Sequence, residues 1–322
     1  MNLRSGPVNP VDRRALTLGL SAVLLVAALG GCGTAAPAGV APPAAAGAPA
    51  PTWAAAPSPA AQDLVTWSGT FPQHRYLVTL AENELTRRCM SDRGFAWSGY
   101  TPDQPTGATD EQRLLDLDRR RREGYGMAAG GDDAEPATAA DPAESTPAYR
   151  LALFGDEKRT GSVEVPGLGT ITYALDGCIA QGYAGVFGDL DSWARVAYLP
   201  QGLNRTAARQ AAADPRYTAA LDGWRRCMAA HGHAYQTPDA IRVALGTAYE
   251  QSTEPAETRL RTEIALAVQD GQCDVQAGLS RTELRLRRES VLALDTAQRA
   301  EVADLAVRFA AAVGRAHALL GR

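Results

Sequence analysis

Residues 225–239, RRCMAAHGHAYQTPD, repeat an earlier stretch at residues 87–103, RRCMSDRGFAWSGYTPD. Both stretches have Arg-Arg-Cys-Met, a glycine five residues after the cysteine, an alanine seven after it, an aromatic residue eight after it, and a final Thr-Pro-Asp. This pattern predicts a helix that ends at a glycine C-cap, Gly94 or Gly232. The Thr-Pro-Asp element predicts that another helix begins there, with threonine as its N-cap and proline at its first position.

A second pair of segments repeats farther along the chain. DGCIAQ at residues 176–181 matches DGQCDVQ at residues 270–276, with a glutamine three residues after each cysteine. The two matches together indicate an internal duplication. We therefore predict two related halves, about residues 70–195 and 210–285, each with an early cysteine on one helix and a late cysteine on another.

These four cysteines predict disulfides, because the apolar run at residues 15–29 is typical of an export signal and an even set of cysteines in an exported protein is typically paired. Three pairings are available, and the repeat selects Cys89–Cys178 and Cys227–Cys273. Reactive thiols and metal ligands are the alternatives. They are less favoured because the chain has no C-x-x-C motif and no obvious activating base near any cysteine.

Helical periodicity dominates the rest of the folded region, and aromatic residues make up only 6% of the chain, which favours closely packed helices. The exception is SVEVPGLGTITY, residues 162–173, where alternation around Pro-Gly-Leu-Gly predicts a β-hairpin. We expect a mainly α-helical domain over residues 62–322, stapled by disulfides and made of the two halves, with one small hairpin.

Three helix boundaries are predicted from local signals. Residues 110–123 are strongly charged and end at a glycine, which indicates one helix. A helix that begins near Asp191 is expected to be interrupted at Pro200. Residues 281–320 carry an apolar residue every three or four positions, which predicts one long C-terminal helix with a core-facing stripe.

The N-terminus has the pattern of an export signal. Residues 1–14 hold three arginines, and residues 15–29 form an apolar run that is too short for a transmembrane helix but typical of a signal peptide. The run ends at Leu29-Gly30-Gly31-Cys32, which resembles a bacterial lipobox. That resemblance implies a lipoprotein signal peptide over residues 1–31, cleavage just before Cys32, and a Cys32 thiol that receives a diacylglyceryl group with acyl chains such as palmitate.

Two alternatives at the N-terminus stay open. An ordinary signal peptidase would cut near Ala35-Ala36 and leave Cys32 discarded or free. Asp12-Arg13-Arg14 also resembles a twin-arginine signal, so the sequence leaves the general and the twin-arginine export routes open.

Residues 33–61 consist almost wholly of alanine, proline, glycine, threonine and serine. With Cys32 they predict a lipidated, disordered tether over residues 32–61. A second low-complexity stretch, residues 128–147, is acidic and predicts a loop inserted in the folded region.

The chain is acidic, with 32 basic and 36 acidic residues. Removal of residues 1–31 leaves a net charge of −6. An acidic chain without Lys/Arg clusters is a poor ligand for nucleic acid or anionic lipid. The expected partners are therefore the membrane, through the lipid anchor, and an envelope protein or the cell wall.

No catalytic motif stands out. G-x-S-x-G, H-E-x-x-H, P-loop and dinucleotide-binding patterns are all missing from the sequence. We expect no enzyme activity, no catalytic residues and no cofactor. His231 and His233 are the nearest approach to a metal site, but Asp222 and Asp239 do not complete a ligand pattern, so no metal is predicted.

The features together resemble the uncharacterised surface lipoproteins of actinobacteria. The resemblance is carried by the lipobox, the Ala/Pro tether, the Arg-Cys-Met helices, and a DGC segment followed by Tyr183 and Gly188-Asp189. It implies this fold and a lipid-anchored location on the extracytoplasmic face of the plasma membrane, and it implies no activity.

We therefore expect a non-catalytic binding or envelope-structural role. A solute-binding lipoprotein of a transporter is the alternative, although it would need two α/β lobes. A wall-modifying hydrolase is less favoured, because it would need a convergent acid/base pair or metal site.

Overall fold

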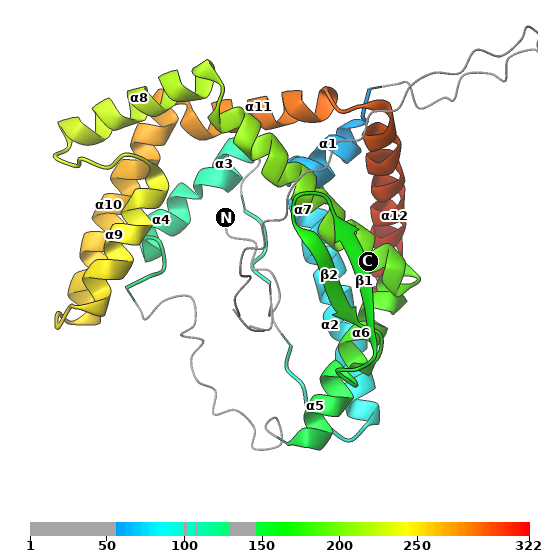
Figure 1. Cartoon of the computed structure of the whole chain (residues 1–322). Coiled ribbons are helices and arrows are strands. Elements are labelled where there is room, and N and C mark those ends of the chain that lie inside the picture. The colour runs from blue at the N-terminus through cyan, green and yellow to red at the C-terminus, as the bar shows by residue number, and fades with distance from the viewer. Residues whose placement is uncertain (1–55, 100–101, 107–108, 129–145) are drawn as a thin grey trace, which may run out of the picture. The chain divides into compact units, whose positions relative to one another are not determined.

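A computed structural model describes residues 56–99, 102–106, 109–128 and 146–322. The predicted signal peptide, Cys32 and all but the end of the tether lie outside the described residues. The described residues are mainly α-helical, with one two-stranded sheet and two disulfides, so the expected fold class is confirmed (Figure 1). Their elements, in chain order, are α1 (Pro59–Thr66), α2 (Phe71–Asp92), α3 (Asp110–Leu115), α4 (Leu117–Glu123), α5 (Pro147–Phe154), β1 (Thr160–Val165), β2 (Gly169–Ala174), α6 (Gly177–Phe187), α7 (Leu190–Ala212), α8 (Pro215–Ala230), α9 (Pro238–Glu250), α10 (Ala256–Ala277), α11 (Leu279–Leu292) and α12 (Thr296–Leu320).

The first half is built on the pair α2 and α6, which lie against α12 and α7. The two helices of the pair run antiparallel, and glycines on α6 let the backbones approach closely. A Cβ on Gly182 would lie 2.9 Å from the carbonyl oxygen of Glu82, so only glycine fits there. The core between these helices contains apolar side chains that include Val78, Val186 and Leu305, each fully buried.

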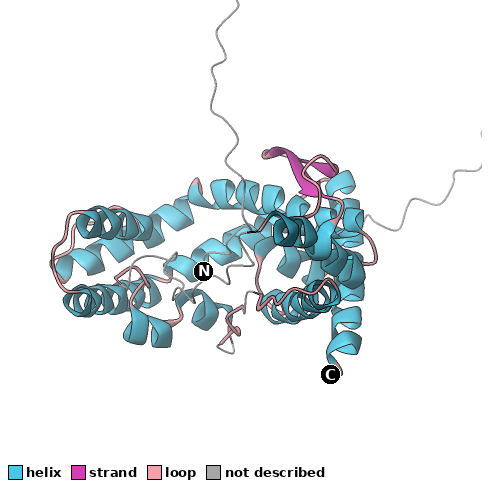
Figure 2. Ribbon diagram, turned by 90° about the horizontal axis from the view of Figure 1, so that it is seen from below, coloured by secondary structure: helices cyan, strands magenta, loops and turns pink. Residues whose placement is uncertain are grey.

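The hairpin β1–β2 lies beside α7 and is antiparallel, with Val163 opposite Ile171 (Figure 2). It covers the predicted residues 162–173 and extends slightly beyond both ends. Val163 and Val165 are buried in the first core. The hairpin therefore covers one side of the helices and has a solvent-facing side of its own.

The second half is a smaller helical group, formed by α8, α9 and α10. α4 and the turn after it belong by sequence to the predicted first half, residues 70–195, but pack on α10 in this group. Its core is centred on Trp224, Met228 and Ile241, none of which is exposed to solvent. α11 continues from α10 and contacts both α8 and α7, so it connects the second half to the first.

The C-terminal helix expected over residues 281–320 is two helices, α11 and α12. The expected single helix is broken between them, because Asp295 is the N-cap of α12 and forms a capping box with Gln298. The stripe on α12 is core, as predicted: Val302, Leu305 and Phe309 are buried.

Three further local predictions are corrected. The charged helix expected over residues 110–123 divides into α3 and α4 at Asp116, which has φ 39° and caps α4 with its own side chain. α7 runs without interruption through Pro200, which is buried. Packing of that face outweighs the roughly 3 kcal/mol that an internal proline costs. The tether ends before residue 61, because Ser58 caps α1.

The Thr-Pro-Asp elements behave differently in the two halves. In the second half Thr237 caps α9 and Pro238 is its first residue, as predicted. In the first half residues 102–106 form no helix. Pro105 explains the difference, because it has no N–H with which to make an early helical hydrogen bond.

Within the described residues, no helix is both long and apolar enough to span a bilayer.

Candidate functional site

The two Arg-Cys-Met helices end in the same way. Cys89 and Cys227 each lie three residues before the last residue of their helix, α2 or α8. Beyond each helix a glycine takes positive φ, 81° at Gly94 and 84° at Gly232. In each half the N–H that follows this glycine donates to the methionine carbonyl oxygen at 3.0 Å. The predicted glycine ends are therefore present in both halves, with Gly94 and Gly232 one residue beyond the C-caps Arg93 and His231.

The disulfides are Cys89–Cys178 and Cys227–Cys273, the two pairings that the repeat predicts. The Cα–Cα distance is 5.5 Å in both. In each disulfide the first cysteine is half-buried and the second is buried. The halves differ in what holds the second cysteine: Cys178 is the second residue of α6, whereas Cys273 lies near the C-terminal end of α10.

A glutamine amide lies beside each half-buried sulfur. Oε1 of Gln181 is 3.1 Å from Sγ of Cys89, and Oε1 of Gln276 is 3.3 Å from Sγ of Cys227. A disulfide sulfur has no proton to donate, so these contacts become S–H···O hydrogen bonds only after reduction. The glutamine that sequence comparison found in both halves is therefore placed to accept from the thiol.

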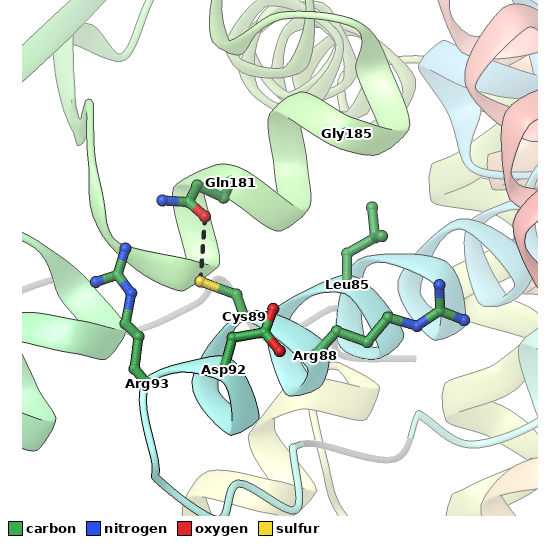
Figure 3. Close-up of a pocket in the computed structure, with 7 residues that line it drawn as sticks. All are labelled: Leu85, Arg88, Cys89, Asp92, Arg93, Gln181 and Gly185. Atoms are coloured by element: carbon green, nitrogen blue, oxygen red, sulfur yellow. Dashed lines mark hydrogen bonds between the residues drawn. The ribbon is translucent and has the colours of Figure 1, made fainter.

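An open hollow of about 360 Å³ lies next to the first disulfide, between α2 and α6 (Figure 3). Leu85, Gly185 and Cys89 contribute to its wall, together with the charged residues Arg88, Asp92 and Arg93 and with Gln181. Figure 3 shows the amide of Gln181 directed at the sulfur.

The arginines of this hollow are already engaged. Arg88 donates to Glu84 at 2.7 Å, and Arg93 donates to the carbonyl oxygen of Ala152 at 3.2 Å. The two arginines that line the hollow therefore have partners within the fold. The hollow does not place a nucleophile beside a base, because its sulfur is held in a disulfide.

The second half contains a buried polar cluster around Asp270, the aspartate of the DGQC segment. Its carboxylate accepts from the Arg120 guanidinium, from Tyr125 Oη at 2.9 Å and from Trp224 Nε1 at 2.9 Å. Burial, together with the charge of Asp270, raises the pKa of Tyr125 well above its ordinary value. The phenol therefore stays protonated and remains a donor.

A second buried carboxylate, Glu263, attaches the turn after α4 to α10. It accepts from the backbone N–H of Tyr125 at 2.6 Å and of Met127 at 2.9 Å, and from Tyr249 Oη at 3.1 Å. Glu263 is fully buried and Asp270 is 2% exposed. Both carboxylates are satisfied inside the protein and are closed to solvent, so their role in this arrangement is structural.

His231 and His233, the two histidines that came nearest to a metal site in the sequence, have different contacts in the structure. His233 Nε2 lies 2.6 Å from Gln269 Oε1. His231 is exposed at the C-cap of α8, and its ring belongs to a group with the sulfurs of Cys227 and Cys273. This grouping was not predicted from the sequence, because both cysteines were expected in a disulfide. The spacing of His231 four residues after Cys227 was the available signal.

Comparison with known proteins gave no match: no protein-family model, no curated protein and no solved structure is similar to this chain.

Proposed function

We propose that the protein is a lipid-anchored cell-surface protein whose mature chain begins at Cys32. The observation that carries the proposal is Leu29-Gly30-Gly31-Cys32 directly after a short apolar run. Two acyl chains on the cysteine would give stable membrane attachment, whereas one chain is marginal. The two disulfides support export, because such bonds persist in oxidising compartments.

We further infer a non-catalytic role, as a binding or envelope-structural protein. The support is chemical: the buried carboxylates Asp270 and Glu263 have their hydrogen bonds satisfied within the fold, and the hollow at Cys89 pairs no nucleophile with a base. A solute-binding lipoprotein remains the alternative. It is less favoured because the described residues contain one hairpin and no α/β lobe.

Metabolic labelling with a fatty acid tests the anchor. The wild-type chain should be labelled and should sediment with membranes, whereas Cys32→Ser should lose the label and the sedimentation. Ala35→Ser is the matched control, because it alters the alternative cleavage site and leaves Cys32 in place. A Cys32→Ser chain that is still labelled would place the anchor elsewhere.

A ligand panel tests the binding class. With both disulfides formed, sugars, peptides, metabolites and metal ions should each raise stability by less than about 1 kcal/mol, since a ligand at 100 times its Kd adds about 2.7 kcal/mol. A clear shift with a sugar or peptide would favour the solute-binding alternative.

A further inference from the structure

We propose that Cys227, His231 and Cys273 form a metal-binding site once the Cys227–Cys273 disulfide is reduced. The ligand is a thiophilic divalent cation of the Zn²⁺ class, since two thiolates and one imidazole are a ligand set that such ions prefer. The proposal is independent of the lipid anchor and adds a ligand to a role that so far has none. In an oxidising compartment it requires a dithiol reductant that reaches this bond while the other disulfides of the compartment persist.

The three ligand atoms are already close together. The two sulfurs and a ring nitrogen of His231 all lie within 4.8 Å of one another. Around a tetrahedral Zn²⁺, at about 2.0–2.3 Å from each ligand, such atoms lie roughly 3.3–3.8 Å apart. The sulfurs must therefore separate from bonding distance while the ring approaches slightly. Cys227 and His231 are one turn apart on the same helix end, so side-chain rotation is enough to bring them together.

Exposure at the site suits both reduction and metal entry. Cys273 is buried, Cys227 is half-buried and His231 is exposed. A reductant can therefore reach the Cys227 sulfur, and water can fill the fourth metal position. Among the described residues no hydrogen bond or ion pair engages the His231 ring. Gln276 can accept from the Cys227 thiol of the reduced form, a hydrogen bond that metal binding then replaces.

The first half offers an internal comparison, because Arg93 occupies the position equivalent to His231. Arg93 lies four residues after Cys89, as His231 lies four after Cys227. A guanidinium stays protonated and has no lone pair for a metal. It also donates to the carbonyl oxygen of Ala152. The same disulfide geometry with Arg93 therefore cannot make this site.

The chemistry balances with a dithiol reductant, either a small molecule or an oxidoreductase. The reductant gives two electrons and two protons to the S–S bond and becomes a disulfide itself. The metal ion then displaces the two thiol protons and binds two thiolates and a neutral imidazole. Because the metal binds only the dithiol form, it favours reduction by mass action.

The test uses the full chain with Cys32→Ser, reduced with a phosphine that is removed anaerobically, and Co²⁺ as the probe. We expect one Co²⁺ per chain, with a sulfur-to-metal charge-transfer band and tetrahedral visible bands that Zn²⁺ abolishes. The oxidised protein should show neither. His231→Arg, which copies the first half, should weaken binding at least tenfold.

His233→Arg is the matched control. Of the two histidines, His231 groups with the sulfurs and His233 contacts Gln269 instead, so His233→Arg should bind Co²⁺ like the parent. An unfolded reduced chain would use either histidine, and the two variants would then behave alike. Equal effects of the two variants, unchanged binding in His231→Arg, or Co²⁺ binding that survives Cys227→Ser/Cys273→Ser would each overturn the proposal.

Discussion

Asp176 and Asp270 occupy the same place in the two repeated segments, but their surroundings differ. Replacing each aspartate by asparagine should therefore lower the free energy of unfolding by very different amounts. The Asp270 side chain is 3% exposed and its partner Arg120 is 16% exposed. In the first half, Asp176 is 26% exposed and its partner Arg159 is 63% exposed. Asp270→Asn keeps the shape of the side chain but replaces one carboxylate oxygen by an NH2 group, which cannot accept a hydrogen bond. At least one of the donors Arg120, Tyr125 and Trp224 then stays buried without a partner.

Breaking a buried ion pair on one side costs about 3–5 kcal/mol, whereas exposed pairs contribute about 0–1 kcal/mol. We therefore expect Asp270→Asn to lower the free energy of unfolding by about 3–5 kcal/mol. Asp176→Asn should lower it by about 1 kcal/mol or less, because asparagine can still accept from the N–H of Asp156. Urea unfolding followed by far-UV circular dichroism measures both. Equal costs for the two variants, or a larger cost for Asp176→Asn, would refute the reasoning.

Three further predictions concern stability. Cys89→Ser/Cys178→Ser opens a loop closed over 89 residues and should cost about 4.6 kcal/mol on the loop-entropy account, measured by urea unfolding. Asp295→Ala removes the capping box of α12 and should cost about 1 kcal/mol in the same assay. Burial raises the pKa of Glu82, and Arg75 opposes the rise. The folded protein therefore holds the Glu82 proton more tightly than the unfolded chain does. As the pH rises above about 4.5 and through the raised pKa, the stability that this proton contributes is lost. Glutamine does not titrate, so Glu82→Gln removes this loss. The melting temperature of the variant minus that of the wild type should therefore increase between about pH 4 and pH 8, and a constant difference across that range would contradict the assignment.

Much of the local structure follows from the sequence alone. The glycine ends at Gly94 and Gly232, the hairpin and both disulfide pairings are confirmed. Each depends on signals within a few residues or on the match between repeats. A left-handed glycine and an alternating pair around Pro-Gly-Leu-Gly are set by backbone sterics, which do not depend on distant contacts.

Tertiary structure decided the remainder. Pro200 stays inside α7 because its face is buried, a fact that no local signal reports. The division at Asp116 depends on a backbone conformation that few residues other than glycine adopt.

The polar cluster of the second half also required the fold. Arg120 and Tyr125 reach Asp270 from 150 and 145 residues away, and sequence spacing says nothing about such a meeting. The same holds for His231, whose place beside Cys227 follows from helical spacing but whose approach to Cys273 follows only from the packing of α8 on α10. Sequence periodicity determined where the helical segments lie. Long-range packing determined that α7 continues through Pro200 and which buried polar groups the helices bring together.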